Sequence, residues 1–111
     1  MWIAELPVVF VKVGGSRIVG RIAIGTPYRA PGGEARCPVA IDGLYSRLND
    51  IAGDGNLQAL LLAIRFVGNL LTDFCEKGGK LFHPSAVSDE DESLDPGYEI
   101  ELSSFFGPLV R

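Results

Sequence analysis

One stretch of 22 residues, Asn56 to Lys77, limits the possible folds of this 111-residue chain more than any other. It reads NLQALLLAIRFVGNLLTDFCEK, and at about 100° per residue its apolar side chains share one broad face. Asp54 to Asn56 offer capping side chains before it, and Gly78 and Gly79 follow it, as is usual where a helix ends. The pattern therefore predicts a long amphipathic helix that a sheet must cover.

The apolar side of this helix is wider than the roughly 100° stripe of a one-sided surface helix. Two interpretations stay open. Either one sheet and its loops cover all of it, or a partner covers the flank near Leu62, Phe66 and Leu70. A second copy of the chain is the simplest such partner. We expect no membrane span, because the run is short and Arg65 interrupts it. The residues predicted to face the core are Leu57, Leu60, Leu61, Ile64, Val67, Leu71, Phe74 and Cys75.

A β-hairpin is predicted before the helix. Trp2–Val13 and Ser16–Gly25 read as strands, and Gly14-Gly15 reads as a two-residue turn. With such a turn Val11 lies opposite Ile18. The side predicted to face the helix carries Val11, Ile18, Ile22 and Ile24, and the other side carries Val8, Phe10, Lys12, Arg17 and Arg21.

Further strands are expected on both sides of the helix. Ala35–Asp42 reads as a third strand, in which Pro38 indicates an edge or a bulge. Lys80–His83 and Tyr98–Leu102 read as short strands after the helix. The fold class is therefore α+β: an antiparallel β-sheet made of a β-hairpin and a third strand, one long helix packed on one face, then one or two short strands.

Charge divides the chain into a body and a tail. Residues 1–80 hold nine Lys and Arg against seven Asp and Glu, whereas residues 81–111 hold one Arg against seven Asp and Glu. We expect a single α+β domain over 1–83, an acidic loop over 84–97, and a C-terminal strand or docking arm over 98–111. The acidic run consists of Asp89, Glu90, Asp91 and Glu92, and it would suit a basic partner surface.

Chemistry-bearing residues are few and dispersed. His83 is the single histidine and has no metal-ligand spacing around it. Cys37 and Cys75 lie on apolar faces and read as small core residues. The sequence thus predicts no catalytic residues, no metal and no cofactor. Tyr28 and Arg29 lie in a Pro/Gly loop, Thr26–Glu34, and are candidate partner contacts.

Four short motifs are similar to those of an uncharacterised family of short bacterial domains. They are WIAE at Trp2–Glu5, IGTPY at Ile24–Tyr28, CPVAIDGL at Cys37–Leu44 and the helical QALLLA at Gln58–Ala63. The resemblance covers roughly residues 2–82. It implies a bacterial origin and no assigned activity.

These features favour a non-enzymatic bacterial protein-binding module, such as an immunity or accessory protein. Its partner would be another protein, or a second copy in a homodimer. The alternative is a small ligand-binding domain or enzyme with a pocket near the Tyr28 loop. The net charge of −4 argues against nucleic-acid binding. The N-terminus has no basic region before its apolar residues, so we expect a cytoplasmic protein with reduced thiols.

Overall fold

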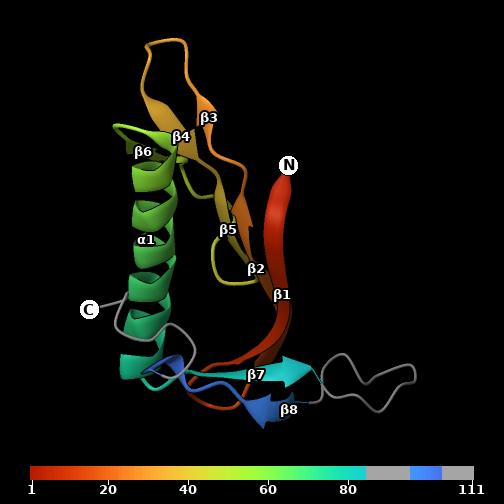
Figure 1. The fold of residues 1–111 in the computed structure, drawn as a ribbon. Coiled ribbons are helices and arrows are strands. Elements are labelled where there is room, and N and C mark those ends of the chain that lie inside the picture. Colours follow the sequence, from red (N-terminus) through yellow and green to blue (C-terminus); the bar gives the residue numbers. More distant parts are fainter. Residues whose placement is uncertain (85–95, 104–111) are drawn as a thin grey trace.

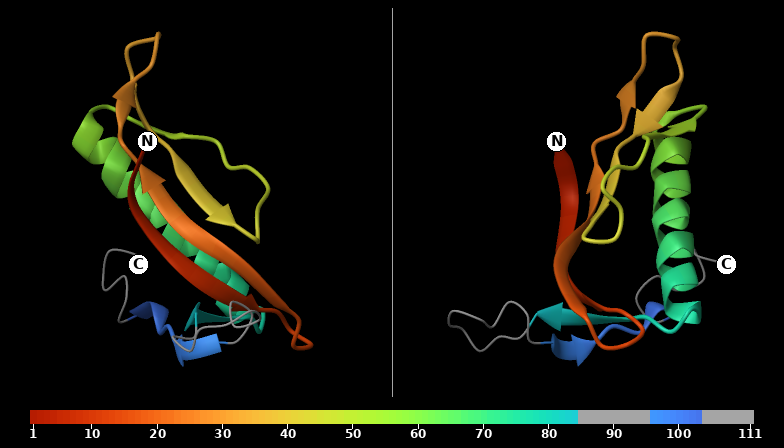
Figure 2. Two further views of the ribbon diagram at one scale, coloured as in Figure 1. Left: turned by 90° about the vertical axis from the view of Figure 1, so that its right-hand side faces the viewer. Right: turned by 180° about the vertical axis from the view of Figure 1, so that it is seen from behind.

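The computed structural model describes residues 1–84 and 96–103 and confirms an α+β fold of antiparallel strands with one long helix (Figure 1). Five strands form the main sheet in the order β5-β2-β1-β7-β8, and three short strands form a second sheet in the order β3-β4-β6. The helix runs beside both sheets (Figure 2). The elements are β1 (Trp2–Val11), β2 (Arg17–Gly25), β3 (Tyr28–Arg29), β4 (Ala35–Cys37), β5 (Val39–Asp42), β6 (Ile51–Gly53), α1 (Asn56–Glu76), β7 (Lys80–Pro84) and β8 (Pro96–Glu99).

The turn of the β1–β2 hairpin is one residue longer than predicted. The backbone N–H of Lys12 donates to the carbonyl of Ser16 over 2.8 Å, which leaves three residues, Val13 to Gly15, in the turn. Both turn glycines have φ near +97°, a conformation that glycine adopts without steric cost. The extra residue shifts the register of the two strands.

The predicted faces of β1 are therefore wrong. Phe10, rather than Val11, lies opposite Ile18. Since successive strand residues point to opposite faces, a shift of one residue exchanges them. Val8 and Phe10 are fully buried in the core beneath α1, and Val11 lies on the outer face of the sheet.

Pro38 divides the predicted third strand between the two sheets. The residues before it form β4, which pairs with β3 and β6, and the residues after it form β5, which pairs with β2. Proline has no N–H for a ladder, so a strand can change sheets at this point without losing a hydrogen bond. Strands β3 and β6 lie in stretches that read as loops.

The helix begins at Asn56 and ends before Gly78 as predicted, but its N-terminal cap differs from the prediction. The N–H groups of Gly78 and Gly79 donate back to carbonyls of the last turn, as in a Schellman motif. At the other end Gly55 is the N-cap and gives no side-chain hydrogen bond. Instead the side chain of Gln58 accepts a 2.6 Å hydrogen bond from the backbone N–H of Asp54.

The helix is rotated relative to the prediction. Leu57 and Leu61, which were expected in the core, are 69% and 45% exposed. The small sheet comes so close to α1 that a Cβ on Gly53 would lie 2.6 Å from the backbone nitrogen of Ala59. Only small side chains fit there. The buried residues of α1 are Ala59, Ala63, Val67, Gly68 and Leu71.

The C-terminal strand belongs to the main sheet. Strand β7 pairs with the end of β1, and β8 pairs with β7. The N–H of Ile100 donates to the carbonyl of Leu81 over 2.8 Å, and Ile100 is part of the core. The described strands reach Pro84 and begin again at Pro96, inside the predicted acidic loop of 84–97.

By length and composition alone, α1 could cross a membrane. The sequence argument that the run is too short is therefore weak. Core helices of globular proteins pass the same test, and α1 lies against two sheets with the charged Arg65 near its middle. The absence of a membrane span stays a prediction.

Candidate protein-interaction site

An apolar groove of about 240 Å³ lies between α1 and the N-terminal half of the β1–β2 hairpin. Ile22 and Val67 are buried and form its floor, and Ala4 and Glu5 are exposed and form its rim. Six of its seven lining residues are apolar. The lining residues are Ala4, Glu5, Leu6, Ile22, Ile24, Ile64 and Val67.

The register of β1 and β2 builds the sheet side of the groove. Ala4 pairs with Ile24 and Leu6 pairs with Ile22, so all four side chains point toward the helix. The small side chain of Ala4 leaves the mouth of the groove open. The groove therefore follows from the corrected register.

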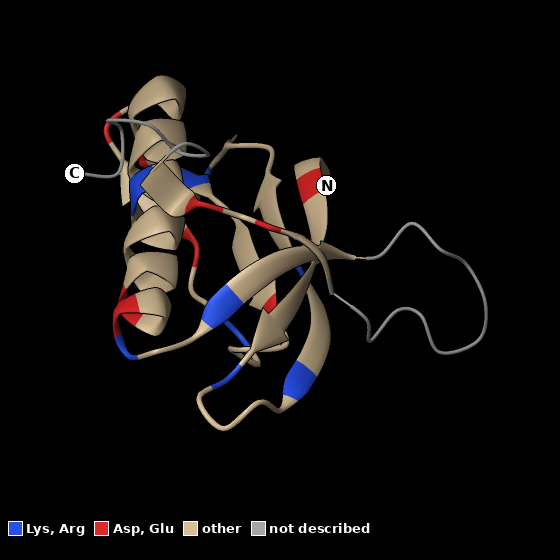
Figure 3. Ribbon diagram, turned by 90° about the horizontal axis from the view of Figure 1, so that it is seen from below, with Lys and Arg blue, Asp and Glu red and all other residues tan. Residues whose placement is uncertain are grey.

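The helix extends this apolar surface beyond the groove. Leu57, Leu61 and Ile64 are spaced i, i+4 and i+7, which places them on one flank of α1. We call these three residues the open flank. Figure 3 shows that few charged residues interrupt α1. Leu57 and Leu61 are large side chains that remain exposed to solvent, and Ile64 connects them to the groove.

The edge of β1 beside the groove is unsuited to pairing with another strand. Among the described residues, β7 covers only Val9–Val11 of this edge. The backbone N–H of Lys12 points toward β2, because it donates to the carbonyl of Ser16. The backbone nitrogens of successive strand residues point alternately to the two sides of the strand, so the nitrogen of Pro7 points away from β2. That nitrogen carries no hydrogen, which removes a donor from the free edge. Recognition at this site would therefore rest on side chains.

Ion pairs neutralise the charges near the groove. Arg21 donates to Asp42 over 2.6 Å and to Glu5 over 2.5 Å, and its guanidinium lies 5.0 Å from the centre of the Trp2 ring. The hydrogen bonds to Asp42 and then Glu5 raise the pKa of Arg21 above its ordinary value. Glu5 is thus held by an arginine, and the groove keeps its apolar character.

The structure places the other predicted contact residues elsewhere. Leu62, Phe66 and Leu70 are half-buried, and the last two pack against the core. The role of these three residues in binding a partner stays a prediction. The acidic residues Asp89 to Glu92 lie outside the described residues.

Tyr28 and Arg29 lie on an exposed hairpin away from the groove. The Tyr28 hydroxyl donates to the Asp50 carboxylate, and this hydrogen bond raises the pKa of Tyr28. Arg29 donates to the carbonyl of Gly33 over 2.6 Å, which closes its own hairpin. Both residues are exposed and available for contact, and their partner role also stays a prediction.

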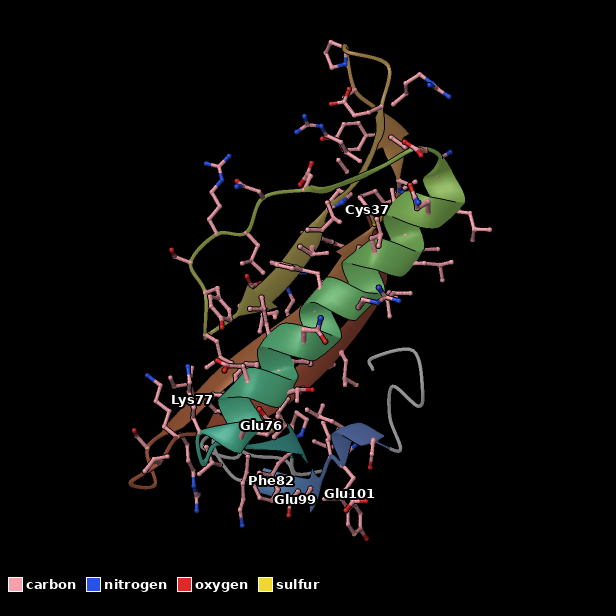
Figure 4. The ribbon with its side chains drawn as sticks, turned by 90° about the vertical axis from the view of Figure 1, so that its left-hand side faces the viewer. Cys37, Glu76, Lys77, Phe82, Glu99 and Glu101 are labelled. Atoms are coloured by element: carbon pink, nitrogen blue, oxygen red, sulfur yellow. The ribbon has the colours of Figure 1, made fainter. Side chains whose placement is uncertain are left out.

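Groups suited to catalysis do not gather in the part of the chain that the structure describes. No cluster of three His, Cys, Asp or Glu residues there could hold a metal ion. Burial raises the pKa of both the Cys37 and the Cys75 thiol, so neither is a ready thiolate. Figure 4 shows Cys37 toward the N-terminal end of α1, and Glu99 and Glu101 near its C-terminal end.

Comparisons of this chain with protein-family models, with curated proteins and with solved structures give no match. A functional interpretation must therefore rest on the groove and its surroundings. The sequence signal for this site was the width of the apolar side of the helix, but the rotation that exposes Leu57 and Leu61 could not be read from it.

Proposed function

We propose that this protein is a non-enzymatic protein-binding module whose groove and open flank receive an apolar element of a partner protein. The observation that carries this proposal is the continuity of the exposed Leu57 and Leu61 with a groove of about 240 Å³. Exposed apolar surface of this kind on a folded domain usually marks an interaction site.

The lining of the groove favours a protein over a small metabolite as its ligand. Sites for small molecules usually combine 300–1,000 Å³ with several converging polar groups. This groove is smaller, and its single polar side chain, Glu5, is engaged by Arg21. A side chain from a partner needs no polar contact inside the groove, because the surrounding interface supplies specificity.

Several finer features belong to the same proposal. The resemblance to short bacterial domains supports a bacterial origin. The acidic run Asp89 to Glu92, which would suit a basic partner surface, supports a role as an immunity or accessory protein. The two free cysteines, Cys37 and Cys75, suit a cytoplasmic location with reduced thiols. The partner is another protein or a second copy of the chain, and the exposed apolar flank suits either.

A pair of matched variants tests the proposal. Leu61 and Val19 are exposed to nearly the same extent, 45% and 44%. Leu61 lies on the open flank, whereas Val19 lies on the outer face of the sheet. Tagged wild-type protein, Leu61→Lys and Val19→Lys would each be used to capture proteins from cells, after thermal melts confirm that both variants fold. We expect wild type and Val19→Lys to capture at least one protein in similar amounts. The amount of that protein captured by Leu61→Lys should be lower by about tenfold or more.

The same variants address self-association. A dimer mass in light scattering for wild type and Val19→Lys, with a monomer mass for Leu61→Lys, would identify the partner as a second copy. Equal capture by all three proteins, together with equal masses, would contradict the proposed site.

A further inference from the structure

We propose that the partner for the open flank is a second copy of this chain, whose α1 packs antiparallel to the first across Leu57 and Leu61. This inference rests on the proposed function and deepens it, because it names the partner and the residues that select it. Those residues are Asp54 and Arg65, which are exposed, oppositely charged and placed at the two ends of the apolar stretch.

The helix carries an apolar ridge with a positive charge at one end. Leu57, Leu61 and Arg65 are spaced i, i+4 and i+8, so they form one of the ridges by which helices pack against each other. All three side chains are exposed. In Figure 4 the β1–β2 hairpin lies behind α1 and leaves the near side of the helix uncovered. The ridge is therefore open to a second helix.

A negative charge lies at the other end of the ridge. Asp54 precedes the N-cap residue Gly55 and is exposed. Within the described part of the chain, neither the Asp54 carboxylate nor the Arg65 guanidinium takes part in an ion pair. The two residues are about 16 Å apart along the helix, at 1.5 Å per residue, so they do not meet within one molecule. Both charges are available to a partner.

A twofold axis that pairs the leucines also pairs these charges. In a symmetric antiparallel pair of helices, each residue faces the residue that lies equally far beyond the axis on the second copy. An axis midway between Leu57 and Leu61 brings each of them opposite the other. The midpoint of Asp54 and Arg65 lies within about 2 Å of this axis along the helix. Each Arg65 therefore comes opposite the Asp54 of the second copy, and the dimer contains this ion pair twice.

The parallel arrangement of the two helices lacks this match. It would bring Arg65 opposite a second Arg65 and Asp54 opposite a second Asp54. Like charges placed opposite each other disfavour association. Of the two symmetric arrangements, only the antiparallel one pairs all four charges while it covers four exposed leucines. The chain is thus complementary to itself at this surface.

Reversal of either charge in the full chain provides the first test. Arg65→Asp and Asp54→Arg each place like charges opposite one another in a dimer of identical chains. Sedimentation velocity over a range of concentrations should show self-association that is about tenfold weaker or more for each variant than for wild type, because two pairs change from attraction to repulsion. Arg47→Asp is the matched control, since Arg47 is an exposed arginine in the loop before β6. It should associate as wild type does.

A mixture of the two reversed variants provides the second test. An Arg65→Asp chain carries two acidic groups at these positions, and an Asp54→Arg chain carries two basic groups. A dimer of one with the other restores both ion pairs, so we expect an equimolar mixture to associate at least as strongly as wild type. Thermal melts of each variant would confirm that both fold. A mixture that associates no more strongly than the separate variants would overturn the inference.

A monomeric wild type at every concentration would also overturn the inference. The proposed function would survive that result if Leu61→Lys still lost a protein that wild type captures from cells. Equal capture by wild type, Leu61→Lys and Val19→Lys, together with equal masses, would contradict the proposed function itself. The failure of this inference and the failure of the proposed function are therefore distinguishable.

Discussion

Gly20 shows how a single residue permits the packing of β1 against β2 and β5. A Cβ at this position would lie 1.8 Å from the backbone oxygen of Asp42 and 2.8 Å from the ring of Phe10. Contacts this short cannot exist, so any side chain would force the strands or the ring to move. The close approach explains why Phe10 can be fully buried at the centre of the core.

We therefore predict that Gly20→Ala destabilises the protein by about 1–3 kcal/mol or more, because it overpacks the core. Urea denaturation would measure the loss. Gly55→Ser is a suitable control, because the N-cap backbone is extended, a Cβ there meets nothing within 4 Å, and serine is favoured at an N-cap. An unchanged urea midpoint for Gly20→Ala would contradict the described packing.

A second prediction at this scale concerns the ion pair of Glu34 and Arg36. Arg36 donates two hydrogen bonds, of 2.7 and 2.9 Å, to one carboxylate oxygen, and these lower the pKa of Glu34 below its ordinary value of 4.5. A lowered pKa means that the folded state favours the charged carboxylate. The stabilisation is thus present above pH 4.5 and is lost as the pH falls through the folded-state pKa.

Glu34→Gln should accordingly be less stable than wild type at pH 7, and the difference should shrink as the pH falls below 4.5 toward pH 3. Denaturation midpoints across this range would show the convergence, with the exposed Glu101→Gln as a matched carboxylate-to-amide control. A stability difference that is the same at both pH values would mean that the pair contributes nothing through charge.

At the scale of elements, the orientation of α1 follows from its smallest residues. The sequence predicts the helix, its C-terminal glycines and the need for a covering sheet. It does not predict the rotation, because apolar residues occupy so much of the circumference that several rotations bury a similar area. The orientation follows from the small, fully buried side chains of Ala59 and Ala63, because the small sheet approaches α1 there. That sheet forms only because the chain passes from one sheet to the other at Pro38.

Two leucines on α1 test this orientation. We predict that Leu71→Ala costs about 2–5 kcal/mol, because Leu71 is fully buried and its loss leaves a cavity. Leu57→Ala should change the free energy of unfolding by less than about 0.5 kcal/mol, because Leu57 is largely exposed. Urea denaturation of the two variants would measure both values. Similar costs for the two variants would indicate the rotation predicted from the sequence.

The free edge of β1 is the second element whose behaviour can be predicted. Pro7 has no backbone N–H to donate at this edge, and this limits pairing with a strand of another molecule. Pro7→Thr would restore the donor, and we expect the mass in light scattering to rise with protein concentration more steeply than for wild type. Pro31→Thr, at the exposed tip of the β3–β4 hairpin, is the matched control. Identical masses for both variants would show that Pro7 does not protect the edge.

At the scale of the whole molecule, the groove depends on features that are not local in the sequence. The groove requires the strand register that the three-residue turn sets, the observed rotation of α1, and the packing of the small sheet against α1. Phe10 and Leu57 illustrate the difficulty, since Phe10 lies on the core face where the outer face was predicted, and Leu57 lies on the exposed flank of α1 where the core was predicted. The excess of apolar surface on the helix could be predicted, because it needs only the helical period. Its location could not be predicted, because it needs the assembled fold.

The central claim is that the open flank and groove bind a protein. Site-specific photo-crosslinking tests this most directly, with a benzophenone amino acid replacing Leu61 in one version of the chain and Val19 in another. Irradiation in cells should give covalent adducts of higher mass from position 61 and few from position 19. Adducts in equal amounts from both positions, or none from position 61, would contradict the account.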